Sequence, residues 1–153
     1  MANTYTQIHI QFVFAVKGRK NLIKEDFRDR LQKYICGIVS ERDHKPLAIY
    51  CMLDHTHLLV GVRPTQSISD LVRDVKAFSS KFINKEGFLK QKFEWQGGYG
   101  AFSYSKSHLP AVIQYVLNQA EHHKKRTFKE EYLDFLKKFE VEYDEEYLFD
   151  FLD

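Results

Sequence analysis

Few features of this chain of 153 residues are those of a membrane-bound or secreted protein. It has only two cysteines, Cys36 and Cys51, which make no disulfide framework, so reduced thiols in the cytoplasm are the simpler interpretation. No apolar run approaches the ~18 residues that would suggest a membrane span. The first residues lack the basic segment and the apolar core of a secretory signal. We therefore expect a cytoplasmic protein that has no contact with a membrane.

The chain also lacks internal repeats, low-complexity stretches and linkers, and its length suits one domain with a real core. Its net charge of +2 conceals an asymmetry, because residues 1–126 carry 20 Lys and Arg against 11 Asp and Glu, whereas residues 127–153 carry 3 against 10. A basic body suits a protein that binds a polyanion, since neutralised phosphates release counterions. The acidic end is unsuited to touching nucleic acid. Oppositely charged surfaces that pair within the fold explain the charge equally well.

Hydrophobic periodicity predicts alternating strands and helices. The expected strands cover residues 8–16, 47–53, 57–62 and 93–104, and the expected helices cover 25–42, 67–85, 108–124 and a segment from 127 onward. The last helix has four aromatic residues on one face, which are Phe128, Tyr132, Phe135 and Phe139. This order predicts an α+β fold of the ferredoxin-like or RRM-like type, in which one antiparallel sheet has helices packed on it and a C-terminal helical tail follows.

Two histidines, His55 and His57, are separated by one residue and followed by an aliphatic run. We expect them at or just past the bend of the hairpin formed by the two middle strands. In an extended strand they point to the same face, whereas Thr56 points to the other. Neutral imidazole is the commonest nitrogen ligand of metals, so the pair is suited to hold a metal ion. A pair of hydrogen-bonded core histidines fits the same pattern.

The helix expected over residues 108–124 has an apolar face beside a second stripe of polar residues. The apolar face contains Leu109, Val112, Ile113, Val116, Leu117 and Ala120. The neighbouring stripe contains Tyr115, Gln119 and His122, at i, i+4 and i+7. Taken alone, such a tyrosine is usually a packing residue with its hydroxyl in water, and such a glutamine is usually solvated.

Together these residues resemble the motifs of the single-tyrosine HUH transposases of insertion sequences, the TnpA-like enzymes, and of their repeat-associated relatives. The His-hydrophobic-His motif corresponds to His55-Thr56-His57, and the Tyr-x-x-x-Gln motif corresponds to Tyr115-Val116-Leu117-Asn118-Gln119. Thr56 is polar where the motif has a hydrophobic residue, but its β-branched side chain still suits a strand. The two motifs occur in the family's order and at its distance, and the resemblance covers nearly the whole chain.

The resemblance implies a metal-assisted reaction on DNA. His55, His57 and Gln119 would hold one divalent metal, Mg²⁺ or Mn²⁺, and no nucleotide cofactor would be needed. Tyr115 would be the nucleophile and would form a 5′-phosphotyrosine link while a 3′-hydroxyl is released. The resemblance does not identify the group that activates Tyr115. His122 lies on the same stripe, although a histidine beside His123 is more typical of a solvated surface.

The implied substrate is single-stranded DNA that folds into hairpins at the ends of the element, and the enzyme would be found with the nucleoid when bound to it. The resemblance also implies a homodimer in which the two subunits share an active site. Basic residues that are plausible phosphate contacts are Lys17, Arg19, Lys20, Lys76, Lys81, Lys124, Lys125 and Arg126. Aromatic residues that could stack on bases, or else belong to the core, are Trp95, Tyr99, Phe102 and Tyr104.

We therefore expect residues 1–126 to form the catalytic domain and residues 127–153 an acidic helical extension of it. The predicted function is that of a transposase that cleaves and rejoins single-stranded DNA. One alternative with the same chemistry is a domesticated endonuclease or strand transferase that acts on repeat hairpins. A second alternative, from another class, is a ferredoxin-like module that binds nucleic acid without catalysis.

Overall fold

The computed structural model describes residues 3–149, with the exception of the side chain of Arg19. Its centre is a four-stranded antiparallel sheet in the order β2-β3-β1-β4. The strands are β1 (His9–Ala15), β2 (Lys45–Cys51), β3 (His55–Gly61) and β4 (Gly100–Tyr104). The helices are α1 (Glu25–Glu41), α2 (Ile68–Glu86), α3 (Leu109–Leu117), α4 (Gln119–His122) and α5 (Phe128–Lys138). Short 3-10 turns lie at Lys17–Arg19, Lys106–His108 and Glu145–Tyr147. The predicted α+β class with one antiparallel sheet is confirmed.

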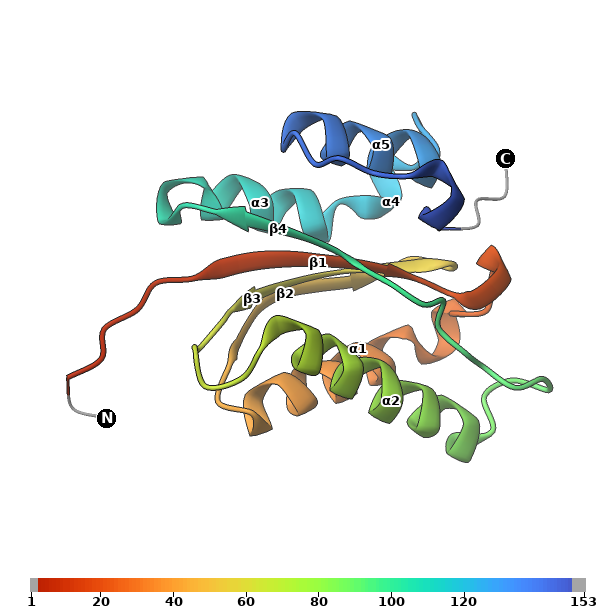
Figure 1. Ribbon diagram of the computed structural model, residues 1–153. Coiled ribbons are helices and arrows are strands. Elements are labelled where there is room, and N and C mark those ends of the chain that lie inside the picture. Colours follow the sequence, from red (N-terminus) through yellow and green to blue (C-terminus); the bar gives the residue numbers. More distant parts are fainter. Residues whose placement is uncertain (1–2, 150–153) are drawn as a thin grey trace.

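The sheet lies between two layers of helices. Helices α1 and α2 cover one face, and α3, α4 and α5 cover the other (Figure 1). The larger core fills the space between the sheet and the α1/α2 layer, and two smaller cores join the other face to α5 and to α3. Within residues 3–149, no helix is both long and apolar enough to cross a bilayer.

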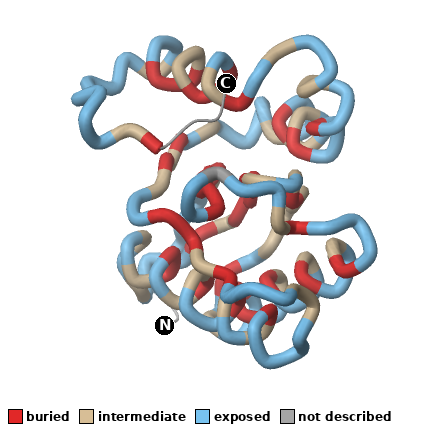
Figure 2. The backbone as a smooth tube through the Cα atoms, turned by 90° about the vertical axis from the view of Figure 1, so that its right-hand side faces the viewer, coloured by how far each residue is buried: buried red, intermediate tan, exposed pale blue. Residues whose placement is uncertain are grey.

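Alternation along the central strands decides which side chains reach each layer. In β1, Ile10, Phe12 and Phe14 belong to the core beneath α1 and α2, whereas Val13 and Ala15 belong to the core beneath α5. Both layers exclude water, so β1 and β3 are buried along almost their whole length. Exposed backbone lies mainly on the outer turns and loops (Figure 2). A polar residue in these strands must therefore find its partners inside the protein.

The observed boundaries differ from the expected ones at several elements, and β2, for example, covers Lys45–Cys51 and not 47–53. The third strand begins at His55, because His55 pairs with Ala15 of β1 and Thr56 pairs with Cys51 of β2. The histidines therefore lie in the strand and not beyond the bend. Of the segment expected as a strand over 93–104, only β4 at its end forms a strand. Trp95 makes a single isolated bridge to Val16. Gly98 there has a φ of 83°, a left-handed conformation that no regular strand adopts.

The helix expected over 108–124 is interrupted at Asn118. Its backbone angles, φ −98° and ψ 26°, lie outside the α-helical region, so α3 ends there and α4 begins at Gln119. Asn118 still donates its backbone N–H to the carbonyl of Gln114, and the two helices remain adjacent. Tyr115 and Gln119 therefore belong to different helices, although they are four residues apart.

Helix α5 packs its aromatic face on the sheet, as its periodicity predicted. It begins with a capping box, in which Thr127 accepts the backbone N–H of Glu130 and the Glu130 side chain accepts the N–H of Thr127. At its centre, Tyr132 lies directly over Gly100 of β4, where an added Cβ would be 2.7 Å from the tyrosine oxygen. This glycine allows the close approach of helix and sheet. The division at residue 126 into domain and extension stays a prediction.

Candidate active site

The two histidines of β3 point toward α5 and have matching hydrogen bonds. His55 and His57 pair with Ala15 and Val13 of β1, whose side chains lie beneath α5. Nδ1 of His55 lies 2.7 Å from Oδ1 of Asp54, and Nδ1 of His57 lies 2.7 Å from Oε1 of Gln11. Because both oxygens are acceptors, each Nδ1 donates its proton to one of them, and each Nε2 is left facing α5. The predicted common orientation of the pair is confirmed.

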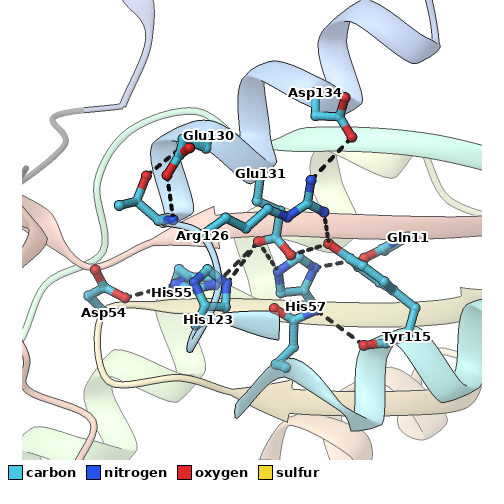
Figure 3. A network of polar contacts seen from close by, with 12 residues as sticks. Gln11, Asp54, His55, His57, Tyr115, His123, Arg126, Glu130, Glu131 and Asp134 are labelled. Atoms are coloured by element: carbon cyan, nitrogen blue, oxygen red, sulfur yellow. Dashed lines mark hydrogen bonds and ion pairs between the residues drawn. The ribbon is translucent and has the colours of Figure 1, made fainter. Parts of the chain in front are cut away.

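The Nε2 atoms of three histidines converge on one carboxylate, that of Glu131 on α5 (Figure 3). Its Oε1 lies 3.1 Å from His57, 3.1 Å from His123 and 3.7 Å from His55. The Glu131 side chain is completely buried. Burial alone would raise the pKa of this carboxyl, but the imidazoles of His57 and His123 outweigh it and hold the pKa far below its usual range.

Tyr115 reaches the same carboxylate from α3. Its hydroxyl donates a hydrogen bond to Oε2 of Glu131 and accepts one from the guanidinium of Arg126 at 3.3 Å. The Tyr115 ring stacks on His122 at a centroid distance of 4.5 Å and meets the His57 ring edge-on at 6.0 Å. Burial, followed by the charge of Glu131, raises the pKa of Tyr115 well above its usual range.

Gln119 lies next to Tyr115 and is also completely buried. Its Nε2 donates to the backbone carbonyl of Tyr115 at 3.2 Å, whereas its Oε1 has no hydrogen-bond partner. Nε2 of His55 is likewise buried without a hydrogen-bond partner. Buried acceptors that lack a donor are costly, and a bound cation would satisfy them.

The donor atoms fit a divalent metal. The ligand atoms of His55, His57, His123 and Glu131 all lie within 4.8 Å of one another. Imidazole nitrogens and a carboxylate form a set that suits first-row transition ions, whereas Mg²⁺ prefers oxygen ligands. The second hydrogen bonds of His55 and His57, to Asp54 and Gln11, are those that orient metal-binding histidines. The cluster is therefore able to bind a metal ion.

The expected DNA-binding lysines lie in different surroundings. Nζ of Lys76 donates to the backbone carbonyls of Gln96, at 2.8 Å, and of Gly98, and burial lowers the pKa of Lys76 to about 8. Lys76 therefore stabilises the loop before β4. Because its ammonium group is held by these two carbonyls, it has little freedom to reach a phosphate. Lys17 forms an exposed ion pair with Glu94 at 3.1 Å.

The other basic candidates are mostly at the surface. Lys20, Lys81, Lys124 and Lys125 are exposed, whereas Arg126 belongs to the site and the side chain of Arg19 lies outside the described part of the chain. Among the aromatic candidates, Trp95 and Phe102 are buried in the core, which excludes them as open stacking platforms. Tyr99 and Tyr104 are partly exposed.

Comparison with known proteins identifies the family. The profile of the family described as IS200-like transposases matches residues 4–119. The chain belongs to this family. This IS200-like transposase is 24% identical to the ISDra2 transposase TnpA of Deinococcus radiodurans over 119 residues, which make up 74% of this chain and 84% of the relative.

Two solved structures share the fold of this IS200-like transposase. A crystal structure from Deinococcus radiodurans R1, assigned to a transposase, has a TM-score of 0.62 and 24% identity, and the match covers 76% of this chain and 94% of that one. The structure of the REP-associated tyrosine transposase bound to a REP hairpin has a TM-score of 0.57 and 17% identity, with 79% of this chain and 72% of that one covered. At these identities the comparisons demonstrate the fold.

Sequence reasoning missed two members of the site of this transposase, His123 and Glu131. Both lie beyond residue 119, where the family match ends. The expectation that His122 is a solvated surface histidine is wrong, because its ring stacks on Tyr115 and its Nε2 is buried. His123, the next residue, contacts Glu131. A signal existed for Glu131, since it lies three residues after Phe128, on the aromatic face of its helix, where an acidic residue needs a buried partner.

Proposed function

We propose that this chain is a transposase that cleaves and rejoins single-stranded DNA at hairpin-marked ends through a phosphotyrosine link on Tyr115. One observation carries the proposal: the Tyr115 hydroxyl and Nε2 of His57 both reach the carboxylate of Glu131. The carboxylate therefore marks a position for an anion between the Tyr115 hydroxyl and the metal-binding type of ligand that His57 offers. A DNA phosphate with an oxygen at this position would hold its phosphorus atom within reach of Tyr115.

His55 and His57 would hold the metal, and Gln119 offers a buried oxygen without a hydrogen-bond partner as a third ligand. When bound, a divalent ion would neutralise the phosphate charge that grows in the transition state. The donor set favours Mn²⁺ over Mg²⁺, because two of the three ligands are imidazoles.

The remaining chemistry belongs to the side chains of the protein. The phenolic oxygen of Tyr115 forms a bond to phosphorus, the bond between phosphorus and the 3′-oxygen breaks, and the proton of the tyrosine ends on the released 3′-hydroxyl. Arg126, whose guanidinium already donates to the Tyr115 hydroxyl, would stabilise the developing phenolate. The energy of the phosphodiester is retained in the 5′-phosphotyrosine, so another 3′-hydroxyl can reverse the reaction and rejoin the strand.

The number of chains that form one active site is a separate part of the proposal. Tyr115 lies beside His57 of its own chain, with ring centroids 6.0 Å apart, which supports a site built from a single chain. The family resemblance instead implies a homodimer with shared sites. Mixing Tyr115→Phe with His57→Ala separates these arrangements. Activity returns in the mixture only if the tyrosine of one subunit serves the histidines of its partner.

A domesticated endonuclease acting on repeat hairpins would use the same residues. The fold shared with the REP-associated transposase bound to a REP hairpin favours keeping this second candidate. The DNA around the gene distinguishes the two. Terminal palindromes that flank the gene as a unit support an insertion sequence, whereas dispersed hairpin repeats without such ends support the endonuclease.

The test is the formation of a covalent adduct. The full chain is incubated with labelled single-stranded hairpins from its own locus and Mn²⁺ or Mg²⁺, and is then run under denaturing conditions. We expect an adduct that Tyr115→Phe and chelation of the metal both abolish, and that Tyr5→Phe, at an exposed position, leaves unchanged. If hairpins bind but no adduct forms, the chain is a binding module and not a transposase.

A further inference from the structure

Helix α5 closes the site that DNA would have to enter. His57, Gln119 and Glu131 have no exposed surface, and His55 is 1% exposed. The ring of Phe128 stacks on His55 at a centroid distance of 3.8 Å and an interplanar angle of 6°. No phosphate can touch the histidines while these contacts persist. The described arrangement is therefore a closed form, in which Phe128 and Glu131 of α5 cover the histidines.

Within this closed form, the carboxylate of Glu131 occupies the place that a substrate phosphate needs. It is the anion in contact with His57 and His123, at 3.1 Å each, and with the hydroxyl of Tyr115. A carboxylate and a phosphate both offer anionic oxygens to metal ions and to hydrogen-bond donors. The two anions cannot be present at this position together.

The two histidines direct their Nε2 atoms at this carboxylate. Since the Nδ1 atoms of His55 and His57 are directed to Asp54 and Gln11, both Nε2 atoms lie opposite the carboxylate of Glu131. A cation between these atoms, either a proton or a metal ion, satisfies the carboxylate and the rings together. Three imidazoles and one carboxylate form the donor set of a four-coordinate transition-metal site.

We infer that Glu131 is an exchangeable ligand that closes the active site. In the absence of DNA, His55, His57, His123 and Glu131 together bind a transition-metal ion of the zinc or manganese class and hold α5 over Tyr115. A DNA phosphate enters by displacing the carboxylate of Glu131. The buried Oε1 of Gln119 has no hydrogen-bond partner. It is the metal ligand that remains beside His55 and His57 once α5 has moved away. This inference rests on the proposed function.

Cobalt binding to the full chain without DNA tests the ligand set. Co²⁺ is titrated into metal-free protein, and the affinity and the visible absorption, which is strong for four-coordinate cobalt, are recorded. We expect Glu131→Gln and His123→Asn to weaken binding roughly 10- to 100-fold and to reduce the absorption, as loss of a ligand or its support does. The matched controls, Glu142→Gln and His108→Asn, change the same residue types at exposed positions and should bind as wild type does.

Amide hydrogen exchange tests the closure itself. Cobalt should slow exchange in α5 of the wild type, and a single-stranded hairpin should reverse this, whereas neither should change exchange in Glu131→Gln. Glu131→Asp keeps a shorter carboxylate and should restore part of the cobalt affinity, which guards against a misfolded variant. Equal cobalt affinity in wild type and Glu131→Gln, with α5 exchange unaffected by metal, would overturn the inference. If the wild type still forms the covalent adduct in that case, only this inference fails and the proposed function stands. If the wild type forms no adduct, the proposed function fails.

Discussion

The hydroxyl of Tyr115 donates a hydrogen bond to the carboxylate of Glu131, a residue from a helix beyond the matched part of the family. Burial and the charge of this carboxylate both raise the pKa of the tyrosine, so they keep the proposed nucleophile protonated. Arg126 acts in the opposite direction on the same oxygen. In the closed form inferred above, the same contacts would keep Tyr115, the proposed nucleophile, inactive.

Replacing Gln11 with methionine should weaken metal binding. Oε1 of Gln11 lies 2.7 Å from Nδ1 of His57 and fixes which ring nitrogen carries the proton. A side chain of similar length without the acceptor leaves the ring free to change tautomer, and we expect roughly 10- to 100-fold lower affinity for Mn²⁺ by calorimetry. Gln7→Met, at an exposed position, is the control. Unchanged affinity in Gln11→Met would show that this hydrogen bond has no part in the site.

Thr127→Ala should loosen α5 and speed adduct formation. The substitution removes the capping box of α5 and should cost about 1 kcal/mol of stability. Ser67→Ala removes the corresponding cap of α2, which packs on the opposite face of the sheet, and should cost a similar amount. Thermal unfolding and the adduct assay measure both effects. A faster reaction in Thr127→Ala alone supports closure by α5, and equal rates in the two variants argue against it.

Gly100→Ala should displace α5 by steric contact. The added Cβ would lie 2.7 Å from the oxygen of Tyr132 and 2.9 Å from the ring of Phe102, so the Tyr132 ring has to move, and we expect α5 to move with it. Overpacking of this kind costs about 1–3 kcal/mol. We expect the substitution to speed amide exchange in α5, relative to the wild type, more than it does in α1 or α2. Gly97→Ala meets no atom within 4 Å and is the control. Exchange in α5 that matches the wild type would contradict the close packing.

Arg126→Gln should slow the chemical step more than it weakens DNA binding. The guanidinium donates to the Tyr115 hydroxyl at 3.3 Å and pairs with Asp134 at 3.2 Å. Loss of a donor to a developing negative charge costs at least roughly tenfold in rate. Single-turnover adduct formation at saturating hairpin measures this effect, with the exposed Arg73→Gln as control. If the hairpin affinity falls instead and the saturated rate is kept, Arg126 is a phosphate contact and not a partner of the tyrosine.

Sequence patterns predicted the parts of the fold in which local preferences and tertiary packing agree. The alternation in β3 placed His55 and His57 on one face, and the periodicity of Phe128, Tyr132 and Phe135 gave the packed face of α5. The break at Asn118 was not predicted, because the apolar pattern runs through it and only the backbone angles reveal the interruption.

The site was only partly visible in the sequence because its members come from separate layers. Tyr115, His55, His57 and Gln119 belong to two motifs, but Glu131 and His123 join them only through the way α5 folds back over the sheet. Spacing along the chain carries no record of that contact. The acidic composition of residues 127–153 suggested that this segment avoids the substrate, so it gave no indication that the carboxylate of Glu131 is buried at the centre of the site.

The most direct measurement is to locate the DNA link in the protein. The wild-type adduct formed on a hairpin from the chain's own locus is digested with protease and nuclease, and the modified peptide is sequenced by tandem mass spectrometry. We expect a single nucleotide-bearing residue, Tyr115, joined to the 5′-phosphate of the cleaved strand. An adduct on another residue, or cleavage that leaves no residue modified, would exclude Tyr115 as the nucleophile.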